Sequence, residues 1–436
     1  MMANLLARLG LAFVGLVMIV PASYAMEIQR VVSPGGIEAW LVEDYAVPIV
    51  AVNFSFAGGT SQDPADRPGL ANMLSGLLDE GAGDLDSKAF QAKLDDLSIG
   101  LSFDSGRDDF FGTLKTLAEN KDEAFSMLAS AVQNPRFDAE PVERIRAQIV
   151  VSINEAKKDP DSVASATIRA MAYPGHPYAQ PPEGTVESIG AVSVADLKGY
   201  RERIFARDHL KVAVVGAIDA KSVGAMLDQV FGPLPAKANL TEIPDTVPKG
   251  GTAEIDMPNP QTVINFGGPG PARNAPDFMA AFVANHILGG GTFSSRLYEE
   301  VRERRGLAYS VGTTLLPFRH SAAVSGSTAT RADRADETVE LIKSEMSRLA
   351  KDGPTEEELA KAKSFLIGSY ALRFDSSSKI ARQLLGIQLD DLGIDYIDKR
   401  NDMVKAVTLD EVKRASQKYF STGTDLIIRV GPHEKS

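Results

Sequence analysis

Residues 289–311 contain the side chains of this sequence that are best suited to holding a peptide. The segment reads GGGTFSSRLYEEVRERRGLAYSV and includes Arg302 and Tyr309. A guanidinium group offers several N–H donors in a planar fork, and a phenol offers one O–H, so that the two together can grip the carbonyl oxygens of a peptide. The alternative is that Arg302 is one of several solvated arginines and that Tyr309 is a half-buried strand aromatic.

A short helix and a strand must position these two side chains. Thr292 or Ser294 can cap the helix, because both residue types are favoured at helix N-termini. Gly306 can close the same helix, and residues 308–311 are typical of the start of a strand. This order predicts that the arginine, in the last turn, lies near the tyrosine at the strand entry.

Three consecutive glycines precede this helix at Gly289, Gly290 and Gly291. They can mark a place where the backbone must approach a substrate or a partner closely. They can equally be a plain terminator of the apolar helix expected over residues 277–288. The sequence leaves both interpretations open.

Composition limits the classes of protein to which this chain can belong. It has 436 residues, 44% of them hydrophobic, which is enough for two or more domains with real cores. The net charge of −12 and the absence of a basic run argue against nucleic-acid binding. There is no cysteine, so disulfides and thiolate metal sites are excluded, and no two of the five histidines are spaced as a helical ligand pair.

The N-terminus has the pattern of an export signal. Arg8 is followed by the apolar run 9–20 and by small-residue cleavage chemistry that ends at Ala25. The apolar run is short for a membrane span, which favours cleavage after Ala25 over an uncleaved anchor. Export without cysteines fits a bacterial periplasm, and we expect no membrane span in the mature chain.

The mature chain reads as two similar halves. Residues 193–198 correspond to residues 408–413, each a capped helix start, and under the same offset a strand ending at Gly216 falls on one ending at Gly431. The order of elements predicts two similar α+β domains, each with helices on one face of its sheet. The expected divisions are a signal peptide at 1–25, an N-terminal domain at 26–235, a linker at 236–251 and a C-terminal domain at 252–436.

Several motifs in both halves resemble those of the pitrilysin/insulinase family, in the short-chain branch that includes mitochondrial processing peptidase subunits. The motifs are Gly58-Gly59-Thr60, Gly69-Leu70-Ala71, His176-Pro177-Tyr178, Gly184-Thr185, Leu288-Gly289-Gly290-Gly291, Ser295-Arg296-Leu297 and Gly306-Leu307-Ala308-Tyr309. The resemblance implies two α/β-sandwich domains, each a mostly antiparallel sheet, which together form half of a clamshell chamber. It also implies that Arg302 and Tyr309 match the family's Arg/Tyr pair, which binds substrate backbone opposite a zinc centre.

The zinc centre is where the chain departs from the family. Relatives that cut peptides carry His-x-x-Glu-His on a helix, in which two imidazoles bind Zn²⁺ and the glutamate activates water. Here, on the helix expected over 69–80, Asn72 and Gly76 replace the histidines and Ser75 replaces the glutamate, while Ser152 replaces the third ligand. Such a set cannot hold Zn²⁺ tightly, so we expect no metal in this chain and no catalytic residue of its own.

The sequence therefore predicts a non-catalytic, substrate-binding subunit of a heterodimeric periplasmic zinc metallopeptidase. A partner chain bearing His-x-x-Glu-His would supply the zinc, and Arg302 and Tyr309 would bind the peptide substrate. The alternative is a peptide-binding or scaffold protein with no proteolytic role. A self-sufficient zinc peptidase is disfavoured by the chemistry of the substituted ligands.

Overall fold

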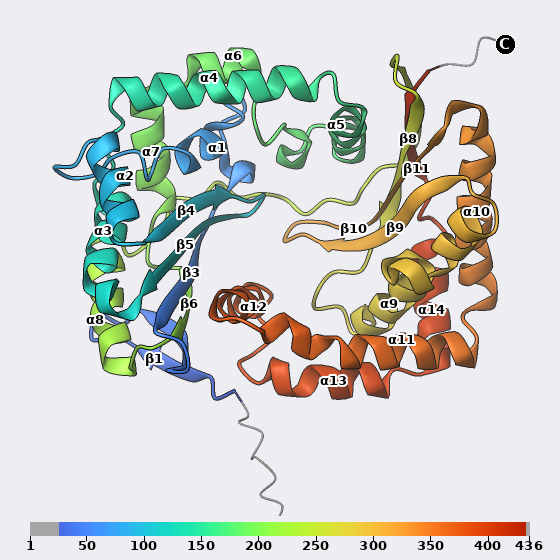
Figure 1. The fold of residues 1–436 in the computed structure, drawn as a ribbon. Coiled ribbons are helices and arrows are strands. Elements are labelled where there is room, and N and C mark those ends of the chain that lie inside the picture. The colour runs from blue at the N-terminus through green and yellow to red at the C-terminus, as the bar shows by residue number, and fades with distance from the viewer. Residues whose placement is uncertain (1–25, 433–436) are drawn as a thin grey trace, which may run out of the picture.

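The computed structural model describes residues 26–432, which form two β-sheets with their helices (Figure 1). The predicted signal peptide at 1–25 lies outside the described residues. No helix within 26–432 is long and apolar enough to cross a bilayer.

The first sheet has six strands in the order β1-β2-β6-β3-β5-β4. Their bounds are β1 Gln29–Val32, β2 Glu38–Glu43, β3 Ile49–Ala57, β4 Gly100–Ser105, β5 Asp109–Leu117 and β6 Lys211–Gly216. The helices of this half are α1 Leu70–Ser75, α2 Ser87–Asp96, α3 Lys121–Gln133, α4 Ala139–Ala156, α5 Pro160–Ala172, α6 Val186–Ala191, α7 Val194–Ile204 and α8 Ala220–Phe231.

The second sheet has five strands in the order β7-β11-β8-β10-β9. Their bounds are β7 Gly251–Asp256, β8 Gln261–Pro269, β9 Ala308–Pro317, β10 Ala322–Arg331 and β11 Leu426–Gly431. The helices are α9 Phe278–Asn285, α10 Ala335–Asp352, α11 Glu356–Gly368, α12 Ser377–Leu389, α13 Tyr396–Ala406 and α14 Leu409–Phe420. Two π-helical segments, η4 His286–Gly290 and η6 Tyr298–Glu303, lie between α9 and β9.

The predicted repeat is confirmed by the two sheets. Strands β2-β6-β3-β5-β4 of the first half have the same order as β7-β11-β8-β10-β9 of the second, and each sheet has a single parallel pair next to antiparallel neighbours. The helices that lead into the last strand of each half, α7 and α14, begin with matching capping boxes at Ser193 and Thr408. The mixed α/β class with mostly antiparallel sheets is therefore as predicted.

Each half lends one helix to the sheet of the other half. Helix α12 packs Ile380 and Leu384 against Trp40 and Val215 of the first sheet. Helix α5 packs Ala164 and other side chains against β8 and β11 of the second sheet. Figure 1 shows both helices on the inward sides of the sheets, whereas α3, α8, α10 and α14 lie on the outward sides. The inward faces are thus partly covered, which the prediction of helices on one face did not include.

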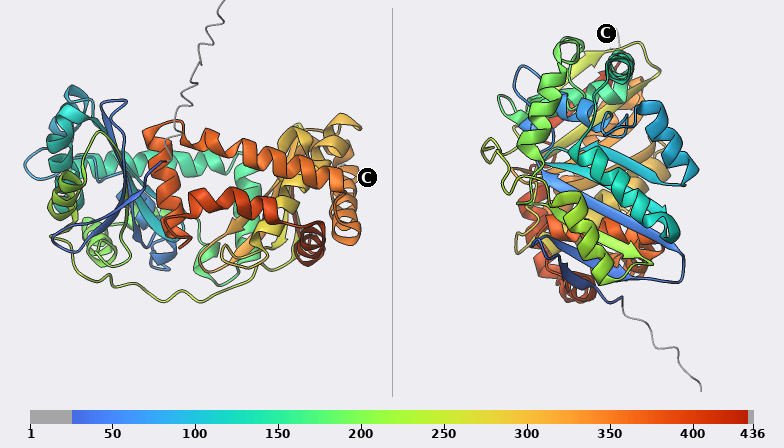
Figure 2. Two further views of the ribbon diagram at one scale, coloured as in Figure 1. Left: turned by 90° about the horizontal axis from the view of Figure 1, so that it is seen from below. Right: turned by 90° about the vertical axis from the view of Figure 1, so that its left-hand side faces the viewer.

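Residues 232–250 form neither helix nor strand and join α8 to β7. Figure 2 shows this segment running along one side of the molecule from the first half to the second. It is fastened at both ends: Thr241 exchanges two hydrogen bonds of 2.8 Å with Gln62, and the amide of Thr246 donates to the carbonyl of His320. The segment overlaps the predicted linker 236–251, and the domain boundaries themselves stay a prediction.

Candidate functional site

The guanidinium group of Arg302 lies between the rings of two tyrosines. Its central carbon is 4.7 Å from the ring centroid of Tyr298 and 4.8 Å from that of Tyr309. Tyr298 is 5% exposed, whereas Tyr309 is 82% exposed. Cation–π contacts of this kind fix the plane of the guanidinium group without using its N–H donors. The predicted proximity of Arg302 and Tyr309 is confirmed, and both side chains keep polar groups that can face a ligand.

A helix end and a turn place Arg302 beside Tyr309. Leu297 and Val301 are fully buried and fix one face of the helix in the core of the second half. Gly306 has a φ of 59°, in the left-handed region that glycine adopts readily, and its amide donates to the carbonyl of Arg302. The chain then enters β9 at Ala308, so the predicted helix end and strand start are confirmed.

The predicted cap of this helix is wrong. Residues Thr292–Ser294 form a separate 3₁₀ turn, and no side chain caps the helix that follows. The hydroxyls of Ser294 and Ser295 instead donate to the carbonyls of Gly291 and Thr292, at 3.1 and 2.9 Å. These two hydroxyls bond to carbonyls of the turn, and the first backbone bond of the helix is donated by the amide of Glu299 to the carbonyl of Ser295.

The three glycines pack against the molecule itself. A Cβ atom at Gly289 would lie 2.8 Å from the amide nitrogen of Thr313, and one at Gly290 would lie 2.7 Å from Nδ2 of Asn285. Asn285 Nδ2 also donates to the carbonyl of Thr313, at 3.2 Å. Segment η4 therefore covers part of β9, an outer strand of the second sheet, and the glycines permit this approach. A contact of Gly289, Gly290 or Gly291 with substrate stays a prediction.

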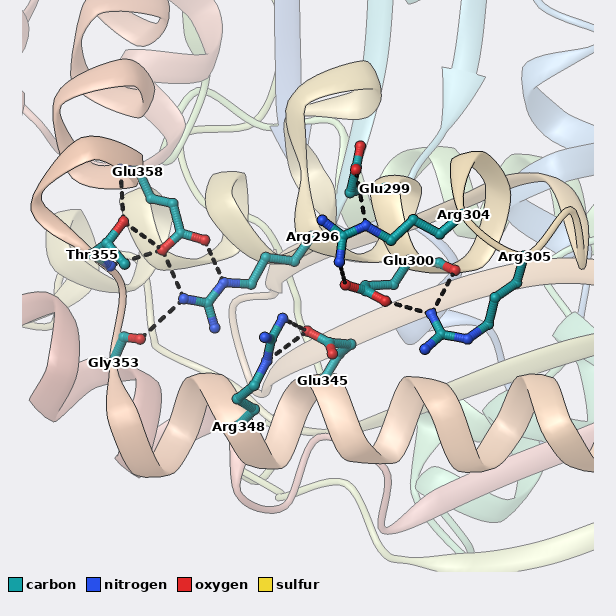
Figure 3. A network of polar contacts seen from close by, with 10 residues as sticks. All are labelled: Arg296, Glu299, Glu300, Arg304, Arg305, Glu345, Arg348, Gly353, Thr355 and Glu358. Carbon is teal, nitrogen blue, oxygen red and sulfur yellow. Dashed lines mark hydrogen bonds and ion pairs between the residues drawn. The ribbon is translucent and has the colours of Figure 1, made fainter.

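Ion pairs fasten the Arg302 helix to its neighbours (Figure 3). Arg296 makes a bidentate pair with Glu358 of α11, at 2.6 and 2.7 Å, and donates to the carbonyl of Gly353. Glu300, on the same helix, is buried and accepts from Arg304 and Arg305. Because bidentate charged hydrogen bonds are short and directional, the Arg296 contacts define the position of the helix against α11, whereas the Glu300 contacts stabilise the segment itself.

The altered metal-site helix is shorter than the predicted 69–80. Helix α1 ends at Ser75, whose hydroxyl donates to the carbonyl of Asn72 at 2.8 Å, and the chain then turns at Gly76. A Cβ atom at Gly76 would lie 3.4 Å from a methyl group of Ile145 on α4, so an apolar side chain borders the place of the second histidine. Ser152 lies exposed on α4.

These residues do not fit a zinc ion. Hydroxyl, amide and hydrogen substituents replace the imidazole and carboxylate donors that Zn²⁺ requires. Within residues 26–432, no group of three or more histidine, cysteine, aspartate or glutamate side chains is placed to hold a metal. The degenerate positions Asn72, Ser75, Gly76 and Ser152 therefore offer no route to metal-assisted hydrolysis by this chain.

Two sequence profiles match most of the described chain. The profile described as insulinase (peptidase family M16) matches residues 40–186, and the peptidase M16 inactive domain matches residues 191–366. The chain belongs to peptidase family M16. A crystal structure of a peptidase M16 inactive domain from Pseudomonas fluorescens superposes with a TM-score of 0.87 at 29% identity, covering 93% of this chain and 98% of that one.

The curated M16 relatives include a protein named as a non-peptidase and proteins named as zinc proteases. The non-peptidase homolog YmxG of Helicobacter pylori is 29% identical over 77% of this chain and 78% of its own length. An uncharacterized zinc protease of Mycobacterium bovis is 25% identical over 94% of each chain. Together with the lost ligands, the matches to an inactive domain and a non-peptidase homolog support a non-catalytic M16 protein.

Sequence reasoning missed a polar cluster where the two halves of this M16 protein meet. The guanidinium group of Arg107 stacks on Tyr178 and Phe318, with its central carbon 4.6 and 4.4 Å from their centroids. The Tyr178 hydroxyl donates to Asp108 at 2.6 Å and accepts from the amide of His320 at 3.0 Å. The His-Pro-Tyr motif at 176–178 was the available signal, but its partners lie too far away along the sequence to be recognised.

Two further features near this cluster serve the fold. His176 lies in a loop, with Nε2 at 2.9 Å from the carbonyl oxygen of Pro244. Strand β3 is an interior strand, paired on both sides by β6 and β5, so it offers no free edge to an added peptide strand.

Proposed function

We propose that this protein is the non-catalytic, substrate-binding subunit of a heterodimeric zinc metallopeptidase in the bacterial periplasm. The observation that supports this role is the Arg302 guanidinium group held between Tyr298 and the exposed Tyr309. An M16 protein that no longer binds peptides would have no need to keep an arginine stacked beside an exposed tyrosine.

The division of labour follows from the side chains. A partner M16 chain bearing His-x-x-Glu-His would supply the zinc ion and the base that activates water. Arg302 and Tyr309 of this chain would donate hydrogen bonds to substrate carbonyls, thereby orienting the scissile bond and stabilising charge that develops on it. The donors are already oriented by the aromatic stack, so little reorganisation is needed when the peptide arrives.

The export signal expected at 1–25 supports placing this pair in the periplasm. The experiment is to mix the mature chain with a purified homologue that carries the zinc motif and to measure cleavage of a quenched fluorescent peptide. We expect cleavage by the pair and none by this chain alone.

Arg302→Ala is expected to lower kcat of the pair by about a hundredfold, because one preorganised donor to developing charge contributes on that order. Arg331→Ala is the matched control, since Arg331 is an exposed arginine whose ion-pair partner among residues 26–432 is the nearby Asp333. Circular dichroism would verify that both variants fold. Unchanged cleavage by the Arg302→Ala pair would refute the assigned role.

The second candidate is a peptide-binding or scaffold protein with no proteolytic role. The relationship to a non-peptidase homolog favours it. It predicts that the mature chain binds peptides with the same affinity in the presence and absence of the zinc-motif homologue and that mixing yields no cleavage.

A further inference from the structure

A cavity of about 330 Å³ lies in the second half of the molecule, between α9, β9, α12, α13 and the 3₁₀ segment Tyr370–Phe374. Aromatic and aliphatic side chains form much of its wall, among them Phe278, Phe282 and Leu315. A volume of this size is sufficient for one large amino-acid residue. The cavity is separate from the Arg302 and Tyr309 pair, neither of which lines it.

Four arginines and one acid line this cavity, although the chain as a whole carries a net charge of −12. Arg273 is neutralised by Asp390, with Nε 2.9 Å from Oδ2, and it also donates to the hydroxyl of Tyr396. Arg400 is only 4% exposed and donates to the carbonyl of Leu366 and to Asn401, and no carboxylate of residues 26–432 forms an ion pair with it.

The other two arginines, Arg373 and Arg382, are exposed. Neither guanidinium group has a hydrogen bond or an ion pair with any residue in the described part of the chain. The wall therefore contains three arginines without an acidic partner, two of which have all their N–H donors available. Such a wall favours an anion, and the planar guanidinium group matches the geometry of a carboxylate.

A buried side-chain amide in the cavity wall favours a ligand that carries an N–H donor as well as a negative charge. Asn285 lines the same cavity and is 7% exposed. Its Nδ2 donates to the carbonyl of Thr313, whereas its Oδ1 has no hydrogen-bond partner within the part of the chain that the structure describes. A buried acceptor without a donor costs free energy, so a ligand that offers an N–H here gains the corresponding stabilisation.

We propose that this cavity binds the C-terminal residue of a peptide. The terminal carboxylate pairs with Arg373 and Arg382, the last peptide N–H donates to Oδ1 of Asn285, and the side chain lies among Phe282 and Leu315. A free phosphate or another small anion would satisfy the arginines but would leave the apolar wall and the amide oxygen without a partner. The assignment does not depend on a zinc-bearing partner.

The cavity can be reached by an extended chain. A second hollow of about 590 Å³, where the two halves meet, shares Arg273, Pro317 and Asp390 with the first. Residues that precede the terminal residue of a peptide therefore have room in the neighbouring hollow while the last residue enters the cavity.

The test is fluorescence anisotropy of the mature chain with a hexapeptide that carries a fluorophore at its N-terminus and ends in leucine. The same peptide with a C-terminal amide and one ending in glycine complete the set. We expect the free-carboxylate leucine peptide to bind about tenfold or more tightly than the amide, because the amide lacks the charge that the arginines recognise. The glycine peptide should bind more weakly because it leaves the apolar wall unfilled.

Arg382→Gln and Arg373→Gln should each weaken binding of the free-carboxylate peptide severalfold, and both are exposed positions whose replacement leaves the core intact. Arg331→Gln, on β10 and outside the cavity, is the control and should leave binding unchanged. Equal binding of the carboxylate and amide peptides, or no binding of either, would overturn the proposal. Displacement by millimolar phosphate without any dependence on the last side chain would overturn it in favour of a plain anion site.

Discussion

Asp63 is a buried carboxyl group that supports the altered metal-site helix. Its two oxygens accept hydrogen bonds from the amides of Gly69 and Ala71, at 2.8 and 2.9 Å. Burial raises the pKa of Asp63 to about 7, against the opposing effect of these amide donors. The group that orders the start of α1 is therefore titratable close to neutral pH.

We predict that Asp63 makes stability depend on pH between about 4 and 7. The pKa is raised in the folded state, so the folded chain holds a proton that the unfolded chain has already released, and stability falls as pH rises through this range. Relative to Asp63→Asn, the wild-type chain should lose on the order of 3 kcal/mol of unfolding free energy between pH 4 and pH 7. Urea denaturation of both proteins at several pH values measures this difference, and parallel stability curves would contradict it.

At the scale of elements, the helix that carries Arg302 depends on α11 through one ion pair. Glu358 binds Arg296 in a bidentate pair and also closes the capping box with Thr355 at the start of α11. Hydrogen bonding to Arg296 lowers the pKa of Glu358 to about 2, although burial opposes it. One carboxylate thus joins two elements that are distant in the sequence.

We predict that Glu358→Ala destabilises the protein by about 2 kcal/mol, because it leaves the largely buried Arg296 without its charged partner and removes a cap. Glu357→Ala is the matched control on the same turn of helix: Glu357 is exposed and pairs with Lys361, so its loss should cost about 0.5 kcal/mol or less. Thermal and urea unfolding measure the stability of both variants. Equal losses of unfolding free energy would show that the pair with Arg296 stabilises the protein no more than an exposed ion pair does.

Helix α12 packs against the sheet of the other half, and weakening this contact should lower the stability of the protein by a measurable amount. Leu384 is fully buried in the cluster that contains Trp40, which is the chain's single tryptophan. Leu384→Ala should destabilise the protein by about 2–5 kcal/mol, as expected for a cavity in a well-packed core. It should also shift the native tryptophan emission. Leu372→Ala, at an exposed position, should change neither property.

The sequence predicted some of these elements and could not predict others. The repeat of the halves followed from local signals, the caps at Ser193 and Thr408, and the Arg302 and Tyr309 pair followed from a helix and a strand that are adjacent in the chain. The exchange of α5 and α12 could not be predicted, because hydrophobic periodicity identifies a buried face but not the sheet that buries it. The π-helical segments and the grouping of arginines around the cavity could not be predicted either, because they also result from contacts between residues far apart in the sequence.

At the scale of the whole molecule, the two halves share their interior. Helix α5 completes the second sheet, α12 completes the first, and Arg107, Tyr178 and Phe318 stack where the halves meet. The segment 232–250 is hydrogen-bonded to both halves rather than hanging free. Neither half can therefore unfold without exposing apolar surface of the other.

We predict that the protein unfolds in a single cooperative step despite its repeated architecture. Tryptophan emission reports the contact of α12 with the first sheet, whereas far-ultraviolet circular dichroism reports all helices in both halves. The two signals should give coincident urea transitions, which is the test of two-state behaviour. If tryptophan emission changes at a lower urea concentration than circular dichroism, α12 leaves the first sheet before the halves unfold, and the exchange of helices does not couple them. Leu384→Ala, which weakens this contact, should move both transitions together to a lower urea concentration if the exchanged helices couple the halves.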